Sequence, residues 1–102
     1  MLFDLNNGNF DKYITKDDLV LVEFYAKWCQ NCLQLEYILE DILDDHFDTL
    51  KIYKINVELE SGLSDKYNVF NLPTLILFKS GKPIKTLINL QSKDNIMKWL
   101  EL

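Results

Sequence analysis

The clearest periodic pattern in the chain lies between residues 30 and 46, where apolar positions recur at helical spacing. The positions i, i+3, i+4, i+7 and i+8 are filled by Leu35, Ile38, Leu39, Ile42 and Leu43. Acidic residues take the opposite side of the same segment: Glu36, Glu40, Asp41, Asp44 and Asp45. The pattern predicts an amphipathic helix from about Gln30 to His46, with its apolar stripe against a core and its acids in water.

Other segments are apolar without helical spacing, which is typical of strands. Leu19–Ala26 is almost continuously aliphatic, β-branched or aromatic, so we expect a strand that is buried on both faces. Ser80-Gly81 is a hairpin signal between two further strands. The remaining strand predictions are the segments 2–5, 51–57, 74–79 and 84–89.

Three shorter helices complete the expected order of elements. They are predicted over Phe10–Thr15, over Ser61–Tyr67, and after Ser92, which is a suitable N-cap. The resulting order β-α-β-α-β-α-β-β-α predicts an α/β fold, because βαβ units pair strands in parallel and the late hairpin adds an antiparallel pair. Helices must then cover both faces of the sheet. No linker or repeat divides the chain, so we expect one domain over residues 1–102.

Composition and charge exclude several classes of protein. The chain has 102 residues, of which 48% are hydrophobic, and this excludes a disordered chain. Its 11 basic residues are all lysines and face 16 acids, which makes nucleic acid a poor ligand because phosphate and base recognition favour arginine. The longest apolar run, Leu19–Ala26, is much shorter than the ~20 residues of a membrane helix. The first nine residues lack the basic start and apolar core of a signal peptide, so we expect a cytoplasmic protein.

The two cysteines, Cys29 and Cys32, lie where the buried strand is predicted to end and the long helix to begin. Unpaired N–H groups and the helix dipole favour negative charge at this point, so a thiolate at Cys29 is stabilised. Cys32 follows nearly one turn later, on the same side of the helix and in a more shielded place. An exposed thiol followed by a shielded one suits attack on a disulfide and resolution of the mixed disulfide.

Two other interpretations of the cysteine pair stay open from the residues alone. A structural zinc ion needs four ligands, and the chain has only these cysteines and His46, which lies at the far end of the predicted helix. A metal site within one chain is therefore not expected, which leaves a site shared between two chains. The second interpretation is a structural disulfide, although so short a loop gains little stability from closure.

The residues around the cysteines resemble the thioredoxin family. The run VEFYAKWCQNC, residues 22–32, resembles the family's active-site strand and turn, and KYNVFNLPTLILFKSGK, residues 66–82, resembles its cis-proline segment and hairpin. Lys54-Ile55-Asn56-Val57 matches the family strand that carries a lysine near the active site. The similarity covers nearly the whole chain. It implies a thioredoxin fold, with a central five-stranded mixed sheet flanked by four helices, and thiol–disulfide oxidoreductase activity.

The resemblance also implies roles for individual residues. Cys29 is the implied nucleophile and Cys32 the resolving thiol, and together they form the redox disulfide. Glu23 aligns with the family's buried aspartate, which accepts the proton of the resolving thiol, and Lys54 aligns with its lysine neighbour. The implied substrate-binding residues are Trp28, Phe70, Leu72, Pro73, Thr74 and Asn89. Among these, Pro73 is expected in a cis peptide bond that turns the backbone before it toward an extended substrate.

Each implied role has a plainer alternative. Glu23 can be a strand-end carboxylate in water, Lys54 a solvated strand lysine, and Phe70 a core residue. Trp28 can be an aromatic that only packs locally, and Pro73 an ordinary trans proline at the start of a strand. A direct pairing of Lys54 with Glu23 is also left open by the sequence.

The chain departs from the family pattern at several positions. Gln30-Asn31 replaces the usual Gly-Pro between the cysteines, and Tyr37 replaces a mid-helix proline, so we expect a straighter helix. Asn68, Asn71 and Asn89 stand where the family has glycines beside its docking groove. Because Gln30-Asn31 keeps hydrogen-bond donors that proline removes, we expect a more stable thiolate and a higher reduction potential than that of thioredoxin.

The function predicted from the sequence is that of a protein-disulfide reductase without a bound cofactor or metal. Its expected partners are disulfide-containing protein substrates and a flavin-containing thioredoxin reductase as electron donor, and we expect a monomer without nucleic-acid or membrane partners. One alternative is a thioredoxin-fold binding module whose cysteines are incidental or regulatory. Another is a reductant dedicated to one partner such as a peroxidase, or a weak oxidant.

Overall fold

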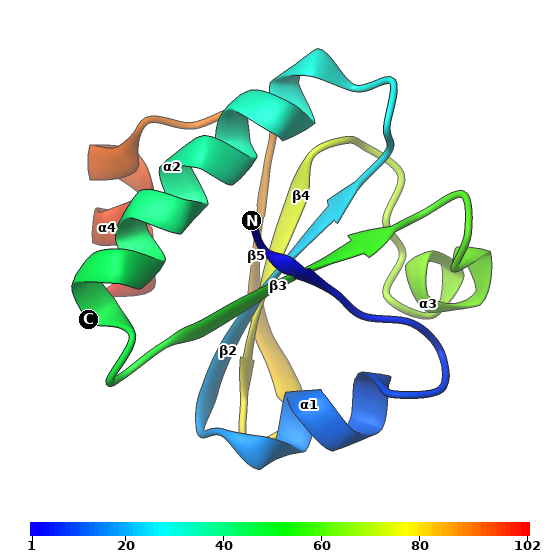
Figure 1. Ribbon diagram of the computed structural model, residues 1–102, viewed down its shortest axis with the longest axis horizontal. Coiled ribbons are helices and arrows are strands. Elements are labelled where there is room, and N and C mark those ends of the chain that lie inside the picture. Colours follow the sequence, from blue (N-terminus) through cyan, green and yellow to red (C-terminus); the bar gives the residue numbers. More distant parts are fainter.

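A five-stranded sheet in the order β1-β3-β2-β4-β5 lies at the centre of the protein (Figure 1). The computed structural model describes residues 1–102. β3 pairs in parallel with β1 and β2, whereas β4 is antiparallel to β2 and β5. The strands are β1 (Phe3–Asp4), β2 (Leu19–Tyr25), β3 (Lys51–Asn56), β4 (Thr74–Lys79) and β5 (Lys82–Ile88). The five-stranded mixed sheet implied by the sequence is confirmed.

Four helices cover the sheet, two on each face (Figure 1). They are α1 (Phe10–Lys16), α2 (Gln30–His46), α3 (Ser61–Lys66) and α4 (Lys93–Leu100). α2 and α4 pack on one face, and α1 and α3 on the other. α2 continues from its first residue to its last without a break, in agreement with Tyr37 in place of a proline. No helix has both the length and the apolar character needed to span a membrane.

The buried side chains form two cores, one on each face of the sheet. Side chains of β2 alternate between them, so that Leu21 faces α2 and α4 while Val20 and Val22 face α1 and α3. The core under α2 and α4 is aliphatic, whereas the other contains the aromatic rings of Phe24 and Phe78. A central strand with a core on each face explains why the run Leu19–Ala26 is apolar without alternation.

Some element ends differ from the sequence prediction. β1 is shorter than predicted, because at the edge of the sheet only two of its residues are in register with β3. β5 begins earlier than predicted and includes Pro83, which an edge strand tolerates because one side needs no N–H donor. The predicted hairpin is confirmed, with positive φ at both Ser80 (51°) and Gly81 (81°). Ser92 caps α4 as predicted, and its Oγ accepts a hydrogen bond of 3.1 Å from the Asn95 N–H.

Candidate active site

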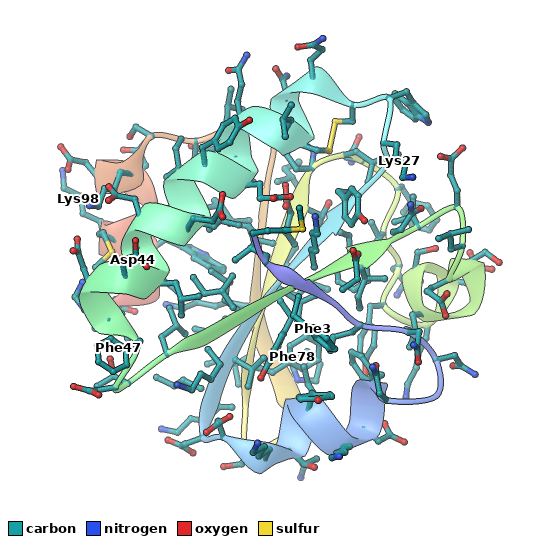
Figure 2. The ribbon with its side chains drawn as sticks, in the orientation of Figure 1. Phe3, Lys27, Asp44, Phe47, Phe78 and Lys98 are labelled. Atoms are coloured by element: carbon teal, nitrogen blue, oxygen red, sulfur yellow. A yellow bond between two sulfur atoms is a disulfide. The ribbon has the colours of Figure 1, made fainter.

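The two cysteines form a disulfide at the N-terminal end of α2, where Figure 2 draws the sulfur–sulfur bond in yellow. Cys29 is the N-cap residue of this helix, and Cys32 lies in its first turn. The backbone N–H of Cys32 donates a hydrogen bond of 3.1 Å to Sγ of Cys29. Cys29 is 9% exposed and Cys32 only 2%. The helix terminus therefore favours negative charge on the Cys29 sulfur, which is also the more accessible of the two.

Two large aromatic side chains beside the disulfide face the solvent. Trp28 is 70% exposed and Phe70 is 83% exposed. They line one hollow of about 430 Å³, together with Val57 and Leu72. Phe70 is therefore not a core residue, and most of Trp28 faces water rather than packing over the cysteines. The hollow adjoins the disulfide, because Leu72 packs against the cysteines as well.

The segment before β4 forms the rest of this surface. The Leu72–Pro73 peptide bond is cis, as predicted. Thr74 is buried, and its Oγ1 donates a hydrogen bond of 2.6 Å to the carbonyl oxygen of Asn71. The N–H of Asn89, a residue with a left-handed φ of 70°, donates to the Pro73 carbonyl oxygen at 2.9 Å. Thr74 and Asn89 thus hold the segment from within, while the N–H and C=O of Leu72 make no hydrogen bond within the chain.

Glu23 is completely buried in the middle of β2, and neither of its carboxylate oxygens has a hydrogen-bond partner. Burial raises the pKa of this carboxyl from an ordinary 4.5 to about 8. The nearby negative charge of Glu36 adds to the rise of the pKa, and the positive charge of Lys54 opposes it. Glu23 is therefore not the solvated carboxylate of the plainer interpretation, and it is largely protonated at neutral pH.

The ammonium group of Lys54 pairs with Glu36 rather than with Glu23. Lys54 and Glu23 are register partners in the parallel pair β2–β3, yet Nζ lies 2.9 Å from Oε1 of Glu36 and 4.0 Å from Oδ2 of Asp4. The placement of Glu36 with the acids in water was wrong, because this side chain is only 9% exposed. Glu36 follows Cys32 by four residues and precedes Leu39 by three, which places it on the same buried side of α2. This spacing was the signal in the sequence for its burial.

A cavity of about 370 Å³ joins the cysteines to this ion pair. Its walls include both cysteines, Leu33 and the Glu36–Lys54 pair, but not Glu23. Tyr25 also lines the cavity; its ring lies 5.0 Å from the Lys54 ammonium. The resolving sulfur and the ion pair therefore share one cavity, and Glu23 lies outside it.

Metal ligands are not gathered anywhere in the protein. No group of three or more His, Cys, Asp or Glu side chains is arranged to hold a metal ion. His46 ends the 17-residue helix that begins beside Cys29, which is a distance of roughly 25 Å along the axis. The cysteine pair therefore lacks the further ligands that a structural zinc site requires.

Comparison with known proteins supports the motif and the fold together. The thioredoxin family model matches residues 1–102. A thioredoxin of Alicyclobacillus acidocaldarius is 37% identical over 92 residues, which are 90% of this chain and 88% of that protein. A thioredoxin of Rickettsia bellii is 33% identical over 101 residues, which are 98% of this chain and 96% of that protein.

Solved structures of thioredoxins have the same fold as this chain. A mutant thioredoxin from Halobacterium salinarum superposes with a TM-score of 0.89 at 30% identity, covering 98% of this chain and 87% of that chain. A Plasmodium falciparum thioredoxin superposes with the same TM-score, 0.89, at 24% identity, covering 98% of this chain and 97% of that chain. The sequence matches cover the Cys29-x-x-Cys32 motif, which the structure presents at a helix N-terminus as a disulfide. The chain belongs to the thioredoxin family and is a thiol–disulfide oxidoreductase.

Proposed function

We propose that the protein is a protein-disulfide reductase in which Cys29 attacks and Cys32 resolves. The thiolate of Cys29 attacks one sulfur of a substrate disulfide, the substrate S–S bond breaks, and the other substrate sulfur leaves as a thiolate. Cys32 then loses its proton and attacks Sγ of Cys29 in the mixed disulfide, which releases the second substrate thiolate. Two electrons have then passed to the substrate, and the protein is left with the Cys29–Cys32 disulfide.

The observation that carries this assignment is the environment of the Cys29 sulfur. It caps α2, it accepts a hydrogen bond from the Cys32 N–H, and it is the more exposed of the two sulfurs. A helix N-terminus lowers the pKa of a thiol and so increases the fraction of thiolate at neutral pH. The same contacts stabilise Cys29 as the leaving group when Cys32 attacks it.

The substrate segment docks in extended form against Leu72. Its free N–H and C=O, next to the disulfide, suit pairing with one residue of an added strand. Pro73 fixes the backbone at this point, and Thr74 and Asn89 support the segment through their hydrogen bonds. Trp28 and Phe70 offer exposed apolar area on which the flanking substrate residues pack.

Glu23 receives the proton that Cys32 loses, and Lys54 is its neighbouring cation. A carboxyl pKa of about 8 lies near the roughly 8.5 of a free thiol, so the transfer changes the free energy little. Only the ionised carboxylate accepts a proton. Resolution by Cys32 is therefore expected to accelerate as the pH rises through about 8.

The oxidised protein needs an electron donor, for which a flavin-containing thioredoxin reductase is the expected partner. Its substrates are proteins with accessible disulfides. We propose that the protein acts as a cytoplasmic monomer with a single domain over residues 1–102. The thiol chemistry suits a reducing compartment, where such a pair turns over instead of remaining a disulfide.

Two cysteine variants test this function. Cys29→Ser is expected to abolish reduction of an accessible protein disulfide, and Cys32→Ser to accumulate a mixed disulfide at Cys29. In the reduced parent protein, a limiting alkylating reagent should modify Cys29 before Cys32, as mass spectrometry of the labelled peptides can show. Faster labelling of Cys32 would reverse the two roles. A parent protein that binds partners but reduces no disulfide would be a binding module instead.

A further inference from the structure

Three carboxyl groups and one ammonium group meet near the cysteines, and we call them the Lys54 cluster: Asp4, Glu23, Glu36 and Lys54. They come from four elements, β1, β2, α2 and β3. The single cation is nearest to Glu36, at 2.9 Å, and farther from Asp4, at 4.0 Å. Neither carboxylate oxygen of Glu23 has a hydrogen-bond partner. One positive charge therefore serves three acids, and its position decides which of them is stabilised as a carboxylate.

We propose that Glu36 is a positioning residue for the exchange reaction, because it holds the Lys54 ammonium on the cavity side and away from Glu23, the register partner of Lys54. The inference rests on the proposed role of Glu23 as the proton acceptor of Cys32. It assigns to Glu36 a function that acts only through its neighbours.

The position of Lys54 on β3 allows its ammonium to pair with either of two carboxylates, that of Glu36 or that of Glu23. Glu23 and Lys54 are register partners on adjacent strands, so the ammonium can reach Glu23 by a change of rotamer. Glu36 lines the cavity, whereas Glu23 is 0% exposed. An ammonium that pairs with Glu36 keeps contact with the cavity, and so loses less of its hydration than it would beside Glu23.

Two further contacts hold Lys54 on the cavity side. The ring of Tyr25 lies 5.0 Å from Nζ, within the range of a cation–π interaction. The Tyr25 hydroxyl donates a hydrogen bond of 2.7 Å to Oδ1 of Asp4, which places that second carboxylate near the ammonium. The Lys54 ammonium is therefore held by contacts with Glu36, Tyr25 and Asp4, and Glu23 is not among the groups that hold it.

Glu23 is surrounded by a few charged groups and otherwise by apolar side chains. The ionisable groups that act on its pKa are Glu36 of α2, Lys54 of β3 and Asp4 of β1. Its register partner on β4 is Leu75, and α4 presents Ile96 and Leu100 to the same core. Lys54 is therefore the only cation that can stabilise the Glu23 carboxylate, and Glu36 is its nearest competitor for that cation.

The test is the substitution Glu36→Gln, which keeps the shape of the side chain and removes its charge. Lys54 is then free to turn to Glu23, and a direct cation partner lowers a carboxyl pKa by about 1 to 3. The lost charge of Glu36 also lowers the Glu23 pKa directly, and comparing Glu36→Gln/Lys54→Met with Lys54→Met measures that direct part alone. The ¹³C shift of the Glu23 carboxyl in the oxidised protein should titrate at least about one pH unit lower than in the parent. The pH midpoint of mixed-disulfide resolution should move by the same amount.

The matched control is Glu40→Gln, the same substitution one turn further along α2. Glu40 pairs with the amino group of Met1 and is not among the groups that shift the Glu23 pKa, so the Glu23 midpoint should not move. Lys54→Met should move the midpoint in the opposite direction, to higher pH, since it removes the only nearby cation. Glu36→Asp restores the charge and should return the midpoint toward the parent value.

The outcomes separate the two proposals. A Glu23 midpoint that is the same in the parent and in Glu36→Gln overturns the inference, and so does a fall that is equally large when Lys54 is absent. The Glu23 midpoint can also fall while the rate of mixed-disulfide resolution keeps its parent pH profile. This result supports the proposal that Glu36 keeps Lys54 away from Glu23, but it contradicts Glu23 as the proton acceptor. If Glu36→Gln does not fold, Glu36→Leu replaces it, because an apolar side chain of similar size also releases Lys54 without leaving a buried charge. An unchanged Glu23 midpoint in Glu36→Leu overturns the inference equally.

Discussion

The core between the sheet and helices α1 and α3 contains packed aromatic rings, whereas the core under α2 and α4 is aliphatic and includes buried charges near the cysteines. In the first core, the ring centroid of Phe78 lies 5.8 Å from that of Phe10 and 5.3 Å from that of Tyr67. Figure 2 shows Phe78 on the side of the sheet that α1 covers. The charged side chains that are almost completely buried, Glu23, Glu36 and Lys54, all belong to the second core or to its edge.

The two faces of the sheet therefore have different roles: one mainly stabilises the fold, and the other also contains the charged groups near the cysteines. Each buried charge costs several kcal/mol of hydration unless a partner offsets it, so the α2/α4 face is the less favourable of the two where it meets the disulfide. The aromatic face carries no such cost. We infer that changes on the aromatic face alter the free energy of unfolding alone, while changes in the Lys54 cluster alter its pH dependence and the thiol chemistry.

The largest expected effect is on the aromatic face. Phe78→Ala removes a completely buried ring and should lower the free energy of unfolding by about 3 to 5 kcal/mol. Urea unfolding measures this change, and disulfide reduction per folded molecule should stay at the parent rate. The matched control is Leu77→Ala, at the residue before Phe78 on β4, which faces the aliphatic core. A lower rate in folded Phe78→Ala would show that the two faces are not independent.

The second prediction concerns Glu23 and pH. Between pH 4.5 and about 8 the folded protein keeps the Glu23 proton while the unfolded chain has lost it. Unfolding therefore releases a proton in this range, and the free energy of unfolding should fall as the pH rises, by about 1.4 kcal/mol per pH unit at most. Over the range from pH 5 to pH 8 we expect a total loss on the order of 3 kcal/mol.

Glu23→Gln removes this titration. Its free energy of unfolding should show a flatter dependence on pH, so that its stability relative to the parent increases steadily toward pH 8. Urea unfolding at four or five pH values measures both slopes. Glu58→Gln serves as the control with the same loss of charge at an exposed residue, and it should keep the slope of the parent. Equal slopes in the parent and in Glu23→Gln would mean that the buried carboxyl titrates near its ordinary value.

The third prediction concerns the residues between the cysteines. Replacing Gln30-Asn31 with Gly-Pro removes one backbone N–H from the first turn of α2, where donors stabilise the Cys29 thiolate. The reduction potential of the disulfide should fall by about 30 mV, equivalent to about 1.4 kcal/mol. The parent value itself should lie a few tens of millivolts above the roughly −270 mV of thioredoxin. Equilibration with glutathione measures both, and Gln34→Ala on the exposed side of α2 should leave the potential unchanged.

The fold and the cysteine motif could be predicted from the sequence because they rest on local patterns. The stripe of α2, the continuous apolar run of β2 and the Ser80-Gly81 turn each reflect the geometry of one element or one connection. The cis bond before Pro73 was predicted by the family resemblance, which covers that segment. These features need no knowledge of which distant elements meet.

The Lys54 cluster could not be predicted in the same way, because it depends on contacts among four elements. The partner of Lys54 is decided by which carboxylate keeps contact with the cavity, and a single sequence does not show the cavity. Helical spacing places Glu36 on the buried side of α2, between Cys32 and Leu39, but it does not show which cation of another element would meet it there. The short β1 likewise depends on its register against β3 at the edge of the sheet.

The smallest expected effect lies on the α2/α4 face but outside the Lys54 cluster. Ser92 Oγ accepts a hydrogen bond from the Asn95 N–H at the start of α4, and Ser92→Ala should cost about 1 kcal/mol in the free energy of unfolding. Ser61→Ala is the matched control, because Ser61 begins α3 without a side-chain cap and should change stability by less than about 0.5 kcal/mol. Neither variant alters a charge near Glu23, so both should keep the parent's slope of stability against pH. A changed slope in Ser92→Ala would mean that the packing of α4, and not the Lys54 cluster alone, determines the titration of Glu23.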